Sequence, residues 1–264
     1  MKKWYAVIGN PIHHSISPKM HEIWFRTHNI DASYVPILVE PDRLEQSVES
    51  LFLLGCSGFN VTVPFKEAIM PFLDELDQSA RSAGTVNTVV RTQTGWKGYN
   101  TDGRGLLASI PNLSQSTRIL VIGAGGAAKG IAAALSDLHI RDVTICNRTL
   151  EKATQLANKY NAKVLDMSEV PAKLPEFDCV IQTTTVGMDS EESPLSNPIW
   201  TSEMVAVDII YSPPQTEFLK QANSQGAFTM NGLAMLIGQG ALAFELWTGI
   251  KPDQKEIVQT IFSS

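Results

Sequence analysis

The sequence has few cysteines, and their positions exclude two kinds of site. Cys56, Cys146 and Cys179 are the only three in 264 residues, and they lie far apart along the chain. An odd number of cysteines at such separations forms no disulfide framework. The three cysteines are also too far apart in the sequence to have the close spacing of metal ligands. We therefore expect no bound metal and a reducing, cytoplasmic environment.

Positive charge and long apolar runs are also scarce. Lys and Arg number 21 against 27 Asp and Glu, which gives a net charge of -6. Without a basic stripe, nucleic acid is not expected as a partner. No run is long enough to cross a membrane, and residues 1–3 lead into a strand-like segment, unlike a secretory signal. The expected partner is a small molecule.

What the chain does contain is a regular alternation of strand-like and helix-like segments. A hydrophobic content of 44% and a charged content of 18% are typical of a soluble globular protein. The length is sufficient for one large or two ordinary domains. Strands over 4–9 and 33–40 alternate with helices over 18–29 and 42–54, which predicts an α/β layer.

The most informative stretch is a strand, a glycine turn and a helix in immediate succession. Residues 119–122 are an apolar run that suits a buried parallel strand, and residues 127–138 have helix propensity. Together they are the context that a dinucleotide-binding G-x-G-x-x-G/A motif requires. Its small residues allow a tight turn, access for a pyrophosphate and close helix packing. The predicted cofactor residues here are Gly123, Ala124, Gly125, Gly126 and Ala127.

The next strand, over 143–146, indicates which dinucleotide is bound. An acidic residue near this point usually accepts hydrogen bonds from a free ribose 2′-OH. Here the strand is followed by Asn147, Arg148 and Thr149, with Lys152 close by. A guanidinium is a charged fork of donors that suits a 2′-phosphate. An exposed surface arginine is the alternative, but the preceding glycine turn favours NADP over NAD.

Two serines follow the first strand. Ser15 and Ser17 can hydrogen-bond a ligand carboxylate, although Ser17 before Pro18 also fits a helix N-cap. The nearby His13, His14 and His21 have no convincing metal spacing and no acidic or cysteine partner.

A second polar group surrounds the end of the strand near residue 63. Asn60 and Thr62 point to one face, and Lys66 follows at the carboxyl end, where α/β sheets bind ligands. An ordinary exposed lysine remains an open alternative for Lys66 from this stretch alone.

Residues farther along complete this polar set. Asn87 lies in a predicted strand over 83–90, where an amide is unusual. Asp102 is either a helix N-cap or, if it lies near Lys66, half of a proton-transfer pair. Gln239 is the polar exception in an apolar helix predicted over 233–248.

Eight motifs in order resemble those of the shikimate dehydrogenase family. They are GNPIHHSISPKMH, NVTVPFK, AGTVNT, YNTDGRG, GAGGAA, NRT, DIIYSPPQT and NGLAMLIGQGALAFELWTG. The similarity covers the chain essentially from end to end. It implies two α/β domains with an active-site cleft between them, an N-terminal substrate domain and a Rossmann-type doubly wound NADP-binding domain.

The resemblance also implies residue roles. Lys66 and Asp102 match the catalytic pair, and Ile209 matches a residue that packs against the nicotinamide. Gly232, in the last of the motifs, is likewise assigned to the cofactor site. The positions that match substrate-binding residues are Ser15, Ser17, Asn60, Thr62, Lys66, Asn87, Asp102, Tyr211 and Gln239.

The family's domain organisation predicts a substrate domain over 1–102 plus 232–264 and a cofactor domain over 103–231. Hinges are then expected near 102–105 and near Asn231. The expected protein is a monomer or a homodimer. Three departures from the family pattern stand out, namely Gln78 in place of an acid, Glu22 after His21, and Gln182 opening an altered turn that ends at Gly187.

The predicted activity is NADPH-dependent reversible reduction of 3-dehydroshikimate to shikimate, in the route to chorismate and aromatic amino acids. One alternative is a broader quinate/shikimate dehydrogenase that uses NAD. A second is a ligand-sensing homologue without turnover, against which the retention of Lys66 and Asp102 argues. A third, an unrelated Rossmann protein such as a folate dehydrogenase, does not explain NVTVPFK together with YNTDGRG.

Overall fold

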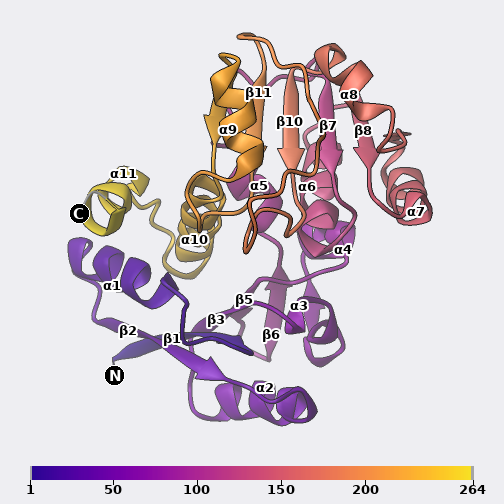
Figure 1. Cartoon of the computed structure of the whole chain (residues 1–264). Helices are drawn as coiled ribbons and strands as arrows, with labels where there is room; N and C mark the ends of the chain where they lie inside the picture. Colours follow the sequence, from indigo (N-terminus) through magenta and orange to yellow (C-terminus); the bar gives the residue numbers. More distant parts are fainter. Residues whose placement is uncertain (1, 263–264) are drawn as a thin grey trace. The chain divides into compact units, whose positions relative to one another are not determined.

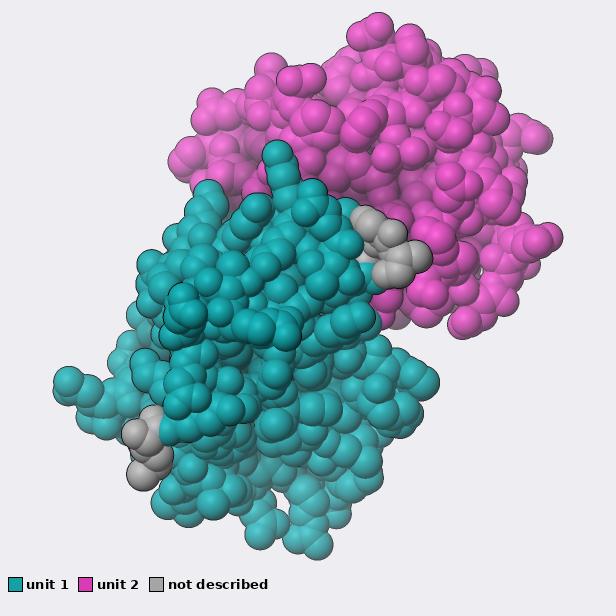
Figure 2. All heavy atoms as spheres, turned by 90° about the vertical axis from the view of Figure 1, so that its left-hand side faces the viewer, with its two compact units in different colours: residues 1–105, 237–264 teal, residues 106–236 magenta. Residues whose placement is uncertain are grey.

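The computed structural model describes residues 2–262, which belong to two compact units (Figures 1 and 2). Unit 1 combines the chain up to Gly105 with the chain from Ile237 onward, and unit 2 is Leu106–Leu236. These boundaries fall a few residues beyond the functional boundaries predicted at 102/103 and 231/232. Which unit binds which ligand remains a prediction.

Unit 1 is built on a mixed six-stranded sheet. The strand order is β2-β1-β3-β5-β6-β4. Strand β1 pairs in parallel with β2 and β3, whereas β5 is antiparallel to both β3 and β6. The strands are β1 (Lys3–Gly9), β2 (Ala32–Leu38), β3 (Gly58–Val61), β4 (Glu75–Leu76), β5 (Thr88–Arg91) and β6 (Trp96–Tyr99). The helices that lie wholly in this unit are α1 (Ser17–Thr27), α2 (Leu44–Leu53), α3 (Phe65–Ala68), α4 (Gln78–Ala83) and α11 (Gln254–Ile257).

One strand of unit 1 is shorter than predicted. The strand expected over 83–90 begins only at Thr88, and α4 occupies the preceding residues up to Ala83. Gly84 ends this helix with a left-handed φ of 70°, which a glycine adopts without strain. Asn87 therefore lies just before β5, where its side chain is available for tertiary hydrogen bonds.

Unit 2 is a parallel six-stranded sheet in the order β12-β11-β10-β7-β8-β9 (Figure 1). Its strands are β7 (Ile119–Ile122), β8 (Val143–Cys146), β9 (Lys163–Val164), β10 (Cys179–Gln182), β11 (Val205–Asp208) and β12 (Phe228–Met230). Its helices are α6 (Gly126–Asp137), α7 (Leu150–Tyr160), α8 (Val170–Lys173) and α9 (Glu217–Ser224).

Helices cover both faces of this sheet. Along β7, Ile119 and Val121 pack with α6 and α7, while Leu120 and Ile122 pack with α8 and α9. A strand buried on both faces has no polar side, which explains the unbroken apolar run in the sequence. The predicted fold class, with a doubly wound Rossmann-type domain, is confirmed.

Helix α10 (Leu233–Thr248) begins in unit 2 and brings the C-terminal segment into unit 1. Gly238 packs directly on the backbone of Gly105, where a Cβ on either residue would overlap with the other segment. Farther along, the Trp247 indole donates to the Val89 carbonyl at 3.0 Å. Two glycines and one anchoring indole thus fix the helix on this unit.

A few short segments complete the description. Helix α5 (Asp102–Leu107) crosses the unit boundary. The remaining turns are 3-10 helices at Pro41–Arg43, Met70–Phe72 and Leu174–Glu176 and a π-helix at Val258–Phe262. Over residues 2–262, the helices are too short or too polar to cross a membrane.

Candidate active site

Lys66 and Asp102 form an ion pair in unit 1. Lys66 lies in α3, which follows β3, and Asp102 is the first residue of α5. The ammonium Nζ is 2.7 Å from Asp102 Oδ2, and the side chains are 28% and 9% exposed. A partly exposed ammonium beside a buried carboxylate can exchange a proton with a bound molecule. The structure therefore brings the two predicted catalytic groups together.

Asn87 holds the other oxygen of the same carboxylate. Its Nδ2 donates to Asp102 Oδ1 at 2.8 Å and to Thr101 Oγ1 at 2.9 Å. Its side-chain oxygen Oδ1 accepts the Thr101 backbone N–H at 2.8 Å, and this bond fixes which way the amide group is oriented. Both oxygens of Asp102 are thus engaged by the protein. Each keeps a free lone pair for a further donor.

Gln239 reaches this network from α10. Its Oε1 lies 3.5 Å from Asn87 Nδ2, and its backbone carbonyl accepts the Thr101 hydroxyl at 3.1 Å. The close packing of Gly105 on Gly238 is what brings the helix within reach. Thr101 was not predicted, because nothing in its local sequence indicates a partner 138 residues away.

Asn60 is oriented by three hydrogen bonds. Its Nδ2 donates to the Asn87 carbonyl and to Thr88 Oγ1, each at 3.0 Å. Its Oδ1 accepts the Tyr34 hydroxyl at 2.7 Å. Burial raises the pKa of Tyr34 well above its usual value, opposed by a hydrogen bond from Ser17. Sequence reasoning missed Tyr34, since a tyrosine in an edge strand has no distinguishing pattern.

The two serines lie at the start of α1. The N-cap of this helix is Ile16, so the alternative interpretation of Ser17 as the N-cap is wrong. Ser17 is 8% exposed, and its backbone N–H donates to Ser15 Oγ at 3.3 Å. Thr62 follows the end of β3 and packs against Gly9. Ser17 makes no capping bond to the helix, and its side chain is hydrogen-bonded to Tyr34.

The glycine turn has the conformation that a nucleotide-binding turn requires. Gly123 adopts a φ of 119°, and a Cβ there would overlap with the Thr183 hydroxyl. By contrast, a Cβ on Gly125 or Gly126 would meet nothing within 4 Å, so the space over the N-terminus of α6 is open. Helix α6 has no side-chain cap at Gly125. Backbone donors with space above them fit a pyrophosphate, and hence a dinucleotide cofactor.

The residues after β8 form a cationic end to α7. Thr149 is the N-cap without a side-chain bond to the helix, and Asn147 Nδ2 donates to its carbonyl at 2.9 Å. Arg148 and Lys152 are exposed. Two exposed cations beside a helix N-terminus match the charge of a phosphate monoester.

The loop after β11 carries Ile209 and Tyr211. Tyr211 is 41% exposed. Gly232 lies so close that a Cβ would overlap with the Ile209 carbonyl, and its N–H donates to the Ile210 carbonyl at 2.9 Å. Burial raises the pKa of Asp208, at the base of this loop, to about 6, opposed by hydrogen bonds from Thr216 and Ile210.

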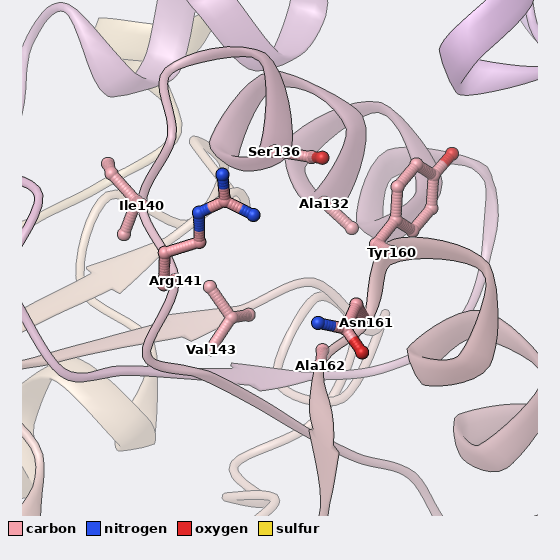
Figure 3. A pocket seen from close by; sticks show the side chains of 8 residues that line it. All are labelled: Ala132, Ser136, Ile140, Arg141, Val143, Tyr160, Asn161 and Ala162. Atoms are coloured by element: carbon pink, nitrogen blue, oxygen red, sulfur yellow. The ribbon is translucent and has the colours of Figure 1, made fainter.

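Two further features are a cavity and the side chain of Gln78. The cavity in Figure 3 includes Val143, the first residue of β8, so it lies at the opposite end of that strand from Asn147. Gln78 begins α4, and its amide donates to Ser82 at 3.0 Å. Over residues 2–262, no three His, Cys, Asp or Glu side chains cluster as metal ligands.

Comparison with known families identifies the chain. Residues 7–89 match the shikimate dehydrogenase substrate binding domain, residues 106–214 match shikimate / quinate 5-dehydrogenase, and residues 232–262 match the shikimate 5'-dehydrogenase C-terminal domain. A shikimate dehydrogenase (NADP(+)) from Geobacillus sp. (strain WCH70) is 45% identical, over 99% of this chain and 98% of its own. The chain belongs to the shikimate dehydrogenase family.

Solved structures agree with this membership. Shikimate 5-dehydrogenase from Thermus thermophilus, in complex with NADP(H) and shikimate, has a TM-score of 0.89 and 33% identity, covering 97% of each chain. The Listeria monocytogenes enzyme, in complex with shikimate and NAD, has a TM-score of 0.92 and 30% identity, covering 99% of this chain and 96% of its own.

Proposed function

We propose that this protein is an NADP-dependent shikimate dehydrogenase, which reversibly reduces 3-dehydroshikimate to shikimate. The observation that carries the proposal is the pairing of Lys66 with Asp102 at 2.7 Å, beside Asn87 and Gln239. An oxidoreductase acting on a ring hydroxyl needs a proton donor and acceptor at that oxygen, and this pair supplies one.

Lys66 is the group that protonates the substrate oxygen during reduction and accepts the proton during oxidation. Asp102 accepts from the lysine and uses a remaining lone pair to accept from a substrate hydroxyl. Because Asn87 holds one carboxylate oxygen and Lys66 the other, the acceptor is already oriented when substrate binds. Bound NADPH supplies the hydride.

The remaining polar groups bind the substrate. The hydroxyl groups of Ser15 and Ser17 hold its carboxylate, and Tyr211 contacts the substrate. Four half-buried or buried polar side chains of unit 1 contact the rest of the substrate. These are Asn60, Thr62, Asn87 and Gln239. Unit 1 is the substrate-binding unit in this proposal.

Unit 2 binds NADP. The backbone of Gly123, Ala124, Gly125, Gly126 and Ala127 holds the pyrophosphate at the N-terminus of α6. Asn147, Arg148, Thr149 and Lys152 hold the 2′-phosphate, and Ile209 with Gly232 borders the nicotinamide. In the cell, the protein is a cytoplasmic enzyme of chorismate and aromatic amino-acid biosynthesis, as a monomer or a homodimer.

A steady-state assay tests the proposal. Absorbance of the reduced cofactor is followed with shikimate or quinate as substrate, each with NADP and with NAD. Rapid reduction of the cofactor is expected only when shikimate is supplied together with NADP. Comparable rates with quinate or NAD would indicate a broader dehydrogenase, and cofactor binding without turnover would indicate a sensing protein.

The Arg148→Ala variant tests cofactor selection. The guanidinium interacts with the 2′-phosphate alone, so its loss is expected to weaken NADP binding about tenfold or more while NAD binding changes little. Titration calorimetry with each cofactor measures the two affinities. Equal losses for both cofactors would show that Arg148 does not recognise the phosphate.

A further inference from the structure

Asp208 is a buried carboxylate for which the proposed reaction has no direct use. It ends β11 after three apolar residues, and its exposed fraction is 0%. A buried acid is costly unless its oxygens are hydrogen-bonded, because burial removes it from water. Its position therefore requires an explanation other than packing.

The partners of Asp208 lie at the two ends of one loop. Oδ1 accepts the Ile210 backbone N–H at 2.9 Å, and Oδ2 accepts the Thr216 hydroxyl at 2.6 Å. Thr216 is 2% exposed and is the N-cap of α9, accepting the Leu219 N–H. One side chain thus joins the end of β11 to the start of α9 and closes the loop over 209–216.

The outer side of this loop is held independently. Gly232 donates to the Ile210 carbonyl at 2.9 Å, and Asn231 Nδ2 donates to the Pro214 carbonyl at 3.1 Å. The loop carries Ile209, assigned above to the cofactor, and Tyr211, assigned above to the substrate. A single conformation of this backbone therefore sets both contacts.

We propose that Asp208 and Thr216 are positioning residues, whose hydrogen bond holds the loop over 209–216 in the conformation that binds cofactor and substrate together. The inference rests on the proposed function for the roles of Ile209 and Tyr211. It is independent of the proton transfer and of 2′-phosphate binding. It explains why Asp208 and Thr216 of unit 2 are buried and hydrogen-bonded to each other.

The test compares Thr216→Val with Thr216→Ser. Valine has nearly the same shape but no hydroxyl, whereas serine keeps the hydroxyl. Loss of the hydrogen bond is expected to raise the KM for shikimate and the KM for NADP together, each about fivefold to tenfold, with a smaller change in kcat. Thr216→Ser is expected to stay within about twofold of wild type for both constants.

Asp208→Asn separates the hydrogen bond from the charge. The asparagine oxygen can still accept from Ile210, and its amide can donate to Thr216, so both KM values are expected to remain near those of wild type. If Thr216→Val does not fold, Thr216→Ala deletes the same hydroxyl without an added methyl group. Unchanged KM values in the hydroxyl-deleted variant, with only a lower Tm, would overturn the proposal.

NADP binding, measured by titration calorimetry, keeps this inference distinct from the proposed function. If wild type binds NADP but does not oxidise shikimate, the proposed function fails. The loop inference still predicts about fivefold weaker NADP binding for Thr216→Val than for Thr216→Ser. Equal NADP affinity in these two variants would refute it, whatever the turnover.

Discussion

Lys66→Ala is expected to lower kcat by about 10²–10⁴-fold while the KM for shikimate changes little. The substitution removes the ammonium that lies 2.7 Å from Asp102 and, with it, the proposed proton donor for the substrate oxygen. Most of the substrate-binding groups remain, so binding is preserved while the chemical step is not. Steady-state rates with shikimate and NADP measure the effect.

Lys97→Ala is the matched control. Lys97 has a similar exposed fraction of 31% and its own acidic partner, Glu75, at 3.8 Å, but it lies on β6 outside the polar network. Its kcat should equal that of wild type. A similar loss of kcat in both variants, or full turnover in Lys66→Ala, would remove Lys66 from the mechanism.

His21 is expected to make the protein sensitive to acid. Both ring nitrogens are buried without a hydrogen-bond partner, and the ring stacks on Tyr34 with 4.5 Å between the ring centroids. Burial lowers the pKa of His21 from 6.5 to about 3. In the unfolded chain His21 is therefore protonated as the pH falls through 6.5, whereas in the folded chain it stays neutral until the pH nears 3.

The sign of the effect follows from this difference in pKa. The free energy of unfolding that the neutral ring contributes is fully present well above pH 6.5 and is lost as the pH falls toward 3. The loss is roughly 3 kcal/mol between about pH 7.5 and about pH 4.5. His21→Phe keeps an aromatic ring but cannot be protonated, so its free energy of unfolding should fall less over this range. Urea denaturation at about pH 7.5 and about pH 4.5 measures both proteins.

His13→Ala is the control for this comparison, because His13 is an exposed histidine of the preceding loop. It should show the same loss of stability with pH as wild type. An identical pH dependence in wild type and His21→Phe would show that protonation of His21 does not drive the acid destabilisation.

Local pattern was sufficient for the parallel unit. The predicted strands over 119–122 and 143–146 coincide with β7 and β8. Strands buried on both faces are continuous apolar runs, and the glycine turn between strand and helix has a required backbone geometry at Gly123. Both signals lie within a few adjacent residues.

Local pattern was insufficient in unit 1, where the sheet is mixed and the polar site is assembled from separate segments. The strand expected over 83–90 begins only at Thr88, and the antiparallel pairing of β5 with β3 and β6 was not predicted. The partners Tyr34 and Thr101 were missed for the same reason. Their hydrogen bonds join residues that are separated by 26 and 138 positions along the chain.

The α/β class, the glycine turn and the identity of the polar side chains are all properties of the sequence. Hydrophobic periodicity indicates which faces are buried, and residue type determines which groups can react. The pairing of Lys66 with Asp102, the closed loop at Asp208 and the buried, unpaired ring of His21 belong to the tertiary structure. Each depends on contacts between segments that are not adjacent in the chain, such as the packing of Gly238 on Gly105, and a hydrogen bond forms only where the fold brings donor and acceptor within about 3 Å.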